Sequence, residues 1–216
     1  LAIGLSIWWL RSDAVREAQR YANNLAAVLA EQTSHSVQAI DLLLNELQER
    51  VEARGAGTPN DFRRLLQGEN AHQLLTERLA RLSHAATMTL TDKDGWMVNS
   101  TSLWPLPPTD ISDREHFQHL RNNDDRGVYI SSPLSDRVKG IPTIFFAKRI
   151  NGAANEFVGM ITIGVRLSYF EHIYGSITSL GDLSFLFLRK DGTVIVRYPD
   201  ATDRAGMERA LAESQA

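Results

Sequence analysis

Apolar residues recur at steps of three and four along the first part of the chain, the spacing of a helix with one apolar face. The pattern predicts a helix from about Ser12 to Ala53, roughly 60 Å long at 1.5 Å per residue, and Gly55 and Gly57 end it. This length exceeds the needs of a compact domain. We therefore expect a stalk that packs on its own domain or pairs with a second copy. Its seam is mixed, with Gln32 bridging one gap, and comprises Val15, Ala18, Ala22, Leu25, Leu29, Ser36, Ile40, Leu43, Leu47 and Val51.

A second helical segment follows the two glycines. Thr58 is expected as its N-cap, with Pro59 at the first helical position and Asp61 at the third. Leucines at helical spacing continue the pattern toward His84. We therefore assign residues 12–69 to the stalk and a connecting helix.

After His84 the pattern becomes that of short strands. Two β-prone runs around Asp94-Gly95 predict a hairpin, and Ser112 with Glu115 three residues later predicts a capping box that opens a short helix. Three more strands are expected, and a turn at Asn151-Gly152 joins the last two. This order predicts an α+β fold in which a long N-terminal helix precedes a five-stranded antiparallel sheet with helices on one face. The three later strands are expected at residues 127–132, 143–150 and 157–165.

A second hairpin is predicted near the end of the chain. Residues 183–189 and 193–198 flank Asp191-Gly192 and resemble the first hairpin. Hairpins with Asp-Gly turns are common, so the similarity can be coincidental. It can equally mark the start of a second, smaller sheet unit.

The first residues suggest a membrane boundary. The chain begins with Leu1, so we expect a segment of a longer protein, and the apolar part of residues 1–11 covers about half of a membrane span. Trp8 and Trp9 stand before Arg11, as where a transmembrane helix leaves the lipid. We assign residues 1–11 to the end of a transmembrane helix, and the alternative is the start of a buried helix.

Composition removes several classes of function. The chain contains no cysteine, which excludes thiolate catalysis and cysteine-ligated zinc. A net charge of -3 gives no bulk attraction for nucleic acid, and none is expected as a partner. His116 and His119 have a metal-compatible spacing but no third ligand nearby. Because no catalytic triad, P-loop or dinucleotide motif occurs either, we expect a segment that is no enzyme and has no metal or cofactor.

The candidate chemistry lies in residues 113–117, DREHF, and in Tyr129-Ile130-Ser131 after them. An arginine fork can bind a carboxylate through two parallel hydrogen bonds. Tyrosine and histidine combine an apolar body with a polar tip, which suits a mostly apolar pocket. The residues predict a wall of a small-molecule site, although a solvated arginine and a core tyrosine would give the same pattern.

Several segments in this order resemble the extracytoplasmic sensor regions of bacterial double-Cache (PAS-like) receptors, found in chemoreceptors, histidine kinases and diguanylate cyclases. Residues 113–117 resemble that family's Arg-x-aromatic-aromatic segment. The resemblance implies that residues 70–167 form a membrane-distal PAS-like domain that binds the ligand. Residues 168–216 would form a linker helix and part of a membrane-proximal PAS-like domain. The other similar segments are residues 128–133, 147–150, 157–170 and 189–199.

The resemblance also implies roles for single residues. Arg114 corresponds to the arginine that grips a ligand carboxylate, and His116 stands where amino-acid-binding members place an aromatic residue. Tyr129 and Ser131 match strand positions that face the pocket.

One departure from the family narrows the ligand. Amino-acid-binding members hold the ligand's ammonium with an acidic residue on the last strand, but residues 158–169 contain no Asp or Glu. We therefore expect a small carboxylate or other anion, bound by Arg114 and by Lys148.

The resemblance implies a periplasmic sensor domain of an inner-membrane histidine kinase, dimeric through its stalk, that passes a conformational change across the membrane. The same sensor could serve a diguanylate cyclase or a chemoreceptor. A ligand-free structural or dimerisation module is the alternative from another class.

Overall fold

The computed structural model describes residues 2–53, 55, 57–178 and 184–198. The chain divides into two compact units, residues 1–39 and 40–216. Helix α1 (Ala2–Ala53) forms all that is described of the first unit and continues into the second. The predicted long helix is confirmed, and it is continuous with the helical segment that was expected before Ser12. Within the described residues, no helix combines the length and the apolar composition that a membrane span requires.

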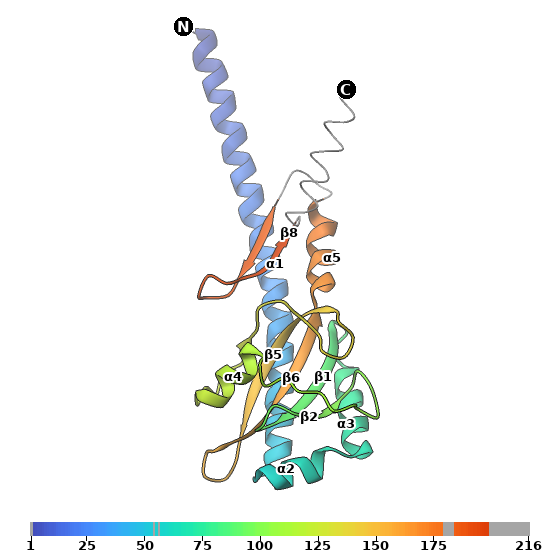
Figure 1. Cartoon of the computed structure of the whole chain (residues 1–216). Coiled ribbons are helices and arrows are strands. Elements are labelled where there is room, and N and C mark those ends of the chain that lie inside the picture. Colours follow the sequence, from blue (N-terminus) through green and yellow to red (C-terminus); the bar gives the residue numbers. More distant parts are fainter. Residues whose placement is uncertain (1, 54, 56, 179–183, 199–216) are drawn as a thin grey trace. The chain divides into compact units, whose positions relative to one another are not determined.

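The second unit is built on an antiparallel sheet (Figure 1). Its strands follow the order β2-β1-β6-β5-β3, and β4 also pairs with β5. The predicted α+β architecture is confirmed, with a short sixth strand that the sequence prediction did not include. The strand expected at residues 127–132 pairs over only two residues. The bounds are β1 (Ala85–Asp92), β2 (Met97–Ser100), β3 (Tyr129–Ile130), β4 (Leu134–Ser135), β5 (Pro142–Asn151) and β6 (Phe157–Arg166).

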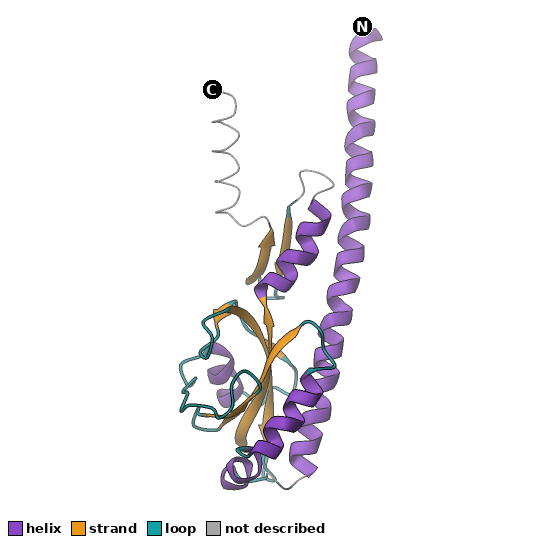
Figure 2. Ribbon diagram, turned by 90° about the vertical axis from the view of Figure 1, so that its right-hand side faces the viewer, coloured by secondary structure: helices purple, strands orange, loops and turns teal. Residues whose placement is uncertain are grey.

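Helices cover both faces of the sheet, which corrects the expectation of helices on one face (Figure 2). The end of α1 lies on one face together with α2 (Pro59–Leu66) and α3 (Glu69–Leu79). Helix α4 (Glu115–Asn122) lies on the other face. The central strands β5 and β6 are therefore buried on both sides along most of their length, as their burial patterns show.

The apolar residues in the second half of the α1 seam are buried in a core between α1 and the sheet. Ile40, Leu44 and Leu47 of α1 are almost fully buried. Leu47 lies against Leu90 of β1 and Ile161 of β6, which are cross-strand neighbours. Burying one such side chain stabilises the fold by about 1.5–3 kcal/mol. In residues 40–53 the stalk helix thus packs on its own domain.

Helix α5 (Leu167–Thr178) leads to a separate two-stranded sheet, β7 (Phe185–Leu188) and β8 (Val194–Tyr198). The predicted second hairpin is confirmed by the β7–β8 register. Its rings pack on α5, with Phe170 and Phe187 at 5.9 Å and Tyr174 and Phe185 at 5.7 Å between ring centroids. That this hairpin opens a second PAS-like unit stays a prediction.

Candidate ligand-binding site

The first turn of α4 positions the predicted site. The helix begins at Glu115, after a turn closed by the Arg114 backbone N–H on the Ile111 carbonyl at 3.0 Å. The predicted capping box is therefore wrong, because Ser112 lies within this turn and Arg114 takes the cap position without a side-chain cap. The Glu115 carboxylate instead accepts hydrogen bonds from the backbone N–H and the hydroxyl of Ser132. It ties the start of α4 to the segment that follows β3.

Arg114 and Arg137 bring two guanidinium groups to this end of the sheet. Arg114 donates from Nη2 to the Ser135 carbonyl in β4 at 2.9 Å. Arg137 forms an ion pair with Asp113, and its hydrogen bond lowers the pKa of that carboxyl below the ordinary range. Arg114 thus keeps most of its donors available beside a second arginine that already holds a carboxylate.

His116 lies beneath them, with only 3 % of its surface exposed. Its ring stacks on Phe145 of β5, with 5.3 Å between ring centroids. Its Nδ1 has no hydrogen-bond partner among the described residues. Burial lowers the pKa of this imidazole to about 4 because the charged form loses its hydration. A buried polar atom without a hydrogen-bond partner costs free energy, so a ligand that supplies a partner for Nδ1 would be favoured here.

These groups surround a small cavity of about 20 Å³, enough for the centre of one water molecule. Thr89 of β1 and Thr162 of β6 form its floor as cross-strand neighbours. Asp136 also lines it, but Oδ1 of this carboxylate accepts the backbone N–H groups of Val138 and Lys139 at 2.6 and 2.8 Å. The cavity therefore offers cations and hydroxyls, together with one carboxylate of which an oxygen is already engaged by the backbone. Its lining is Thr89, Met97, Ile111, Arg114, His116, Ser135, Asp136, Arg137, Phe145 and Thr162.

Two predicted site residues lie near this cavity but do not line it. The Ser131 hydroxyl accepts the Phe145 backbone N–H at 2.9 Å and donates to the Ser132 carbonyl at 2.7 Å, so it fastens the end of β3 to β5. Tyr129 stacks on His119, with 4.4 Å between ring centroids. Its hydroxyl accepts a hydrogen bond at 3.2 Å from Arg189, in the turn between β7 and β8.

The structure does not bring Lys148 to this site. Lys148 alternates along β5 with Phe145, which stacks on His116, and so it lies on the opposite face of the sheet. Its ammonium donates to the Asn45 side chain of α1 within the core of that face. Lys148 and Arg114 therefore cannot hold one ligand between them in this arrangement.

Sequence reasoning missed Thr89, Thr162 and Arg137. Strand alternation could have indicated the two threonines, since Thr89 alternates with apolar residues in β1 and Thr162 does so in β6. Arg137 lies in a loop with no periodicity, and only the folded chain places it beside Arg114.

The sequence matches no known family profile and no curated protein. Solved structures share its fold. The extracellular domain of rpHK1S-Z16, a protein named as a histidine kinase, superposes with a TM-score of 0.66 at 24 % identity, over 82 % of this chain and 68 % of that one. The ligand-binding domain of the Pseudomonas fluorescens chemoreceptor CtaA, solved with L-serine, gives 0.60 at 17 %, over 87 % and 74 %.

An extracellular ligand-binding receptor from Desulfohalobium retbaense gives a TM-score of 0.60 at 18 % identity, over 79 % of this chain but only 30 % of that one. At these identities the likeness concerns the fold. The fold is that of extracellular ligand-binding sensor domains, which is what the resemblance of the sequence implied.

Proposed function

We propose that this chain is the periplasmic sensor domain of a membrane-bound histidine kinase and that it binds a small anion between α4 and the sheet. The observation that carries the proposal is the buried, unpaired Nδ1 of His116, a residue that lines one cavity together with Arg114. A carboxylate placed there would receive charge-assisted hydrogen bonds from Arg114, which are shorter and stronger than neutral ones. It would also give the His116 ring nitrogen a partner.

Binding would require the cavity to open, because its present volume of about 20 Å³ fits no carboxylate. The Arg137–Asp113 ion pair is the contact that an anion would replace, since Asp113 is a carboxylate already bound to a lining arginine. Asp113 is 63 % exposed in its side chain, so it would return to water at little cost. Opening and ligand capture then amount to a shift between two populations of the domain.

The lining favours an anion over an α-amino acid. CtaA was solved with L-serine, so an amino acid is the natural comparison. Here the inward-facing Thr162 stands on β6, and that strand carries no carboxylate to receive an ammonium. Asp136 is the carboxylate that lines the cavity, but backbone N–H groups of its own turn hold its Oδ1, and Arg114 and Arg137 in the same lining repel an ammonium.

Calorimetric titration of the chain with acetate, lactate, succinate, malate and citrate, and with the standard amino acids, tests the proposal. One or more of the carboxylates should bind, and Arg114→Ala should weaken that binding about 10- to 100-fold, the value of a charge-assisted hydrogen bond. Arg121→Ala removes an exposed arginine of α4 outside the cavity and serves as the control. Tight binding of an amino acid, or equal binding by both variants, would contradict the proposal.

The remaining assignments extend the proposal to the whole receptor. Residues 1–11 would end a transmembrane helix, residues 70–167 would be the membrane-distal domain, and residues 168–216 the linker helix and part of a proximal domain. A histidine kinase output is supported by the fold shared with rpHK1S-Z16. A diguanylate cyclase or a chemoreceptor is the alternative, and the coding sequence of the intact gene after Ala216 would decide between them.

A stalk dimer is also part of the proposal. In the first unit Tyr21 and Val28 are 47 % and 60 % exposed and lie one heptad apart, as in a coiled-coil seam. Val28→Glu should lower the dimer fraction in sedimentation measurements, and Glu17→Ala serves as a control. If the chain dimerises and no small molecule changes its melting temperature, the ligand-free dimerisation module is the better description.

A further inference from the structure

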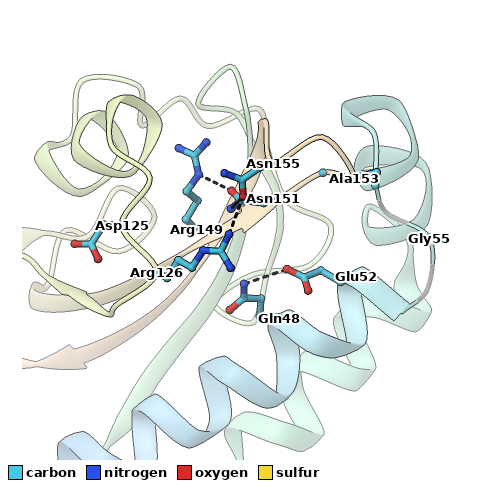
Figure 3. A pocket seen from close by; sticks show the side chains of 11 residues that line it. Gln48, Glu52, Gly55, Asp125, Arg126, Arg149, Asn151, Ala153 and Asn155 are labelled. Atoms are coloured by element: carbon cyan, nitrogen blue, oxygen red, sulfur yellow. Dashed lines mark hydrogen bonds between the residues drawn. The ribbon is translucent and has the colours of Figure 1, made fainter.

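A larger cavity, of about 510 Å³, lies elsewhere in the second unit (Figure 3). Its volume is in the range of small-molecule sites. It shares no residue with the cavity around His116. The side chains that line it come from the last turns of α1, the loop after α4, strand β5 and the β5–β6 turn. They include Gln48, Glu52, Asp125, Arg126, Arg149 and Asn155.

The two arginines and two acidic residues of this lining balance in charge, and two of the four, Arg149 and Asp125, are already engaged by backbone groups. The Arg149 guanidinium is mostly buried and caps the end of α4, where it donates to the carbonyls of Leu120, Arg121 and Asn123. This is the favourable position for a cation at a helix C-terminus. Arg149 is therefore a fixed wall of the cavity with its charge largely satisfied.

Asp125 is held on the same side. Its Oδ1 accepts the Gly127 backbone N–H at 2.9 Å, and its Oδ2 lies 3.5 Å from Nε2 of His119. The carboxylate is thus part of the loop structure. It repels an anion from this wall without offering both oxygens to a cation.

A network of amides positions the most available group, Arg126 (Figure 3). The Asn155 side-chain oxygen accepts from Arg126 Nη2 at 3.2 Å and from Asn151 Nδ2 at 2.9 Å. Its amide nitrogen donates to Asp124 at 2.8 Å. Asn155 has φ 64°, the left-handed region that asparagine tolerates better than most residues. Its side chain is therefore the hub that fixes Arg126 before any ligand arrives.

On the α1 side, Gln48 donates from Nε2 to Glu52 Oε1 at 3.0 Å. This bond leaves the Gln48 carbonyl oxygen and the second Glu52 oxygen as acceptors. The cavity thus has donors on Arg126 and acceptors on Gln48 and Glu52.

We propose that this cavity is a second binding site, for a small neutral polyhydroxylated molecule such as a sugar or polyol. An anion would meet Glu52 and Asp125, and a cation would meet Arg126 and Arg149. A hydroxyl group donates one hydrogen bond and accepts two, so a neutral polyol can bond to both kinds of wall without leaving a charge unpaired. The site differs from the proposed anion site in its residues and in its ligand chemistry.

Titration of the whole chain with D-glucose, D-galactose, D-ribose, myo-inositol and glycerol, followed by 1H–15N NMR, tests this site. At least one of these compounds should shift the side-chain amide signals of Asn151, Asn155 and Gln48. Asn155→Gly removes the hub while glycine keeps the positive φ, and it should weaken binding about tenfold. Gln48→Ala should weaken binding about threefold, whereas Gln38→Ala, at an exposed position of the same helix, should not.

Gln48→Ala changes a partly exposed helix position to the best helix former, so it keeps the test valid if Asn155→Gly unfolds. The proposal is overturned if none of the five compounds shifts these signals, or if both variants bind as the unchanged chain does. It is also overturned if only charged molecules, such as amino acids or dicarboxylates, bind here. Arg114→Ala should leave polyol binding intact and Asn155→Gly should leave anion binding intact, so the two proposals fail separately.

Discussion

The burial of His116 should make the stability of the domain depend on pH in a defined window. Its pKa in the folded chain is about 4, against 6.5 for an unperturbed histidine, because burial penalises the charged ring. Between these values the unfolded chain binds more protons than the folded chain. Stability attributable to His116 is therefore present near pH 7 and is lost as the pH falls through 6.5 toward 4.

The size of the effect follows from the same two values. At pH 4.5 the imidazole of the unfolded chain is protonated, while that of the folded chain is still mostly neutral. Linkage then gives a loss of about 2 kcal/mol in the free energy of unfolding between pH 7 and pH 4.5. His116→Phe keeps an aromatic ring against Phe145 and removes this titration. Between pH 7 and pH 4.5 its free energy of unfolding should therefore fall by about that amount less than the free energy of unfolding of the unchanged chain.

Urea unfolding followed by tryptophan fluorescence, at several pH values between 7 and 4.5, measures the difference. Carboxylates titrate in the same range, but they do so in both proteins and cancel in the comparison. His35→Phe, at an exposed position of α1, is the control, because it shows how the loss of an imidazole that is not buried changes the free energy of unfolding. If the stabilities of the unchanged chain and His116→Phe run parallel with pH, His116 is not buried in its neutral form and the reasoning is wrong.

Two further substitutions test the packing of the sheet. Gly159→Ala should lower the free energy of unfolding by about 1–3 kcal/mol, because the new Cβ would lie 2.5 Å from the Thr91 carbonyl oxygen and 2.8 Å from Phe62. A loss below about 0.5 kcal/mol in the free energy of unfolding, measured in urea, would show that β6 shifts to accommodate the added methyl group. Asn45→Leu should cost about 1–3 kcal/mol because it removes the partner of the buried Lys148 ammonium. The double variant with Lys148→Met should return close to the original stability, and an additive loss would count against this pairing.

Hydrophobic periodicity was enough to predict most of the fold, and the reasons for the misses are physical. The strands β5 and β6 carry nearly continuous apolar runs, which is the mark of a sheet buried on both faces. That signal was present in the sequence and pointed to a helix on each side. The two-residue strand β4 has no periodicity to detect, because it pairs only through Leu134 and Ser135.

The site was harder to predict than the fold. The residue types of Arg114 and His116 indicated a pocket wall, and the structure brings both to one cavity. Assigning Lys148 to the same ligand required knowing which face of β5 α4 covers, and alternation alone gives two equivalent answers. Ser131 has a side chain suited to a ligand, but its hydroxyl instead bonds the backbone of Phe145. Such local competition between backbone and ligand cannot be read from residue type.

Arg189 connects the β7–β8 hairpin to the edge of the main sheet through hydrogen bonds. Its guanidinium donates to the Tyr129 hydroxyl and, at 2.8 Å, to the Ile130 carbonyl, so both contacts fall on β3. Linkage is reciprocal: a ligand that fixes β3 must tighten the hairpin by the same free energy that the hairpin adds to ligand binding. The hairpin is then an effector built into the chain. Arg189→Ala should raise the dissociation constant of the ligand by a certain factor. The ligand should slow amide hydrogen exchange in β8 of the unchanged chain by the same factor, and unequal factors would disprove the coupling.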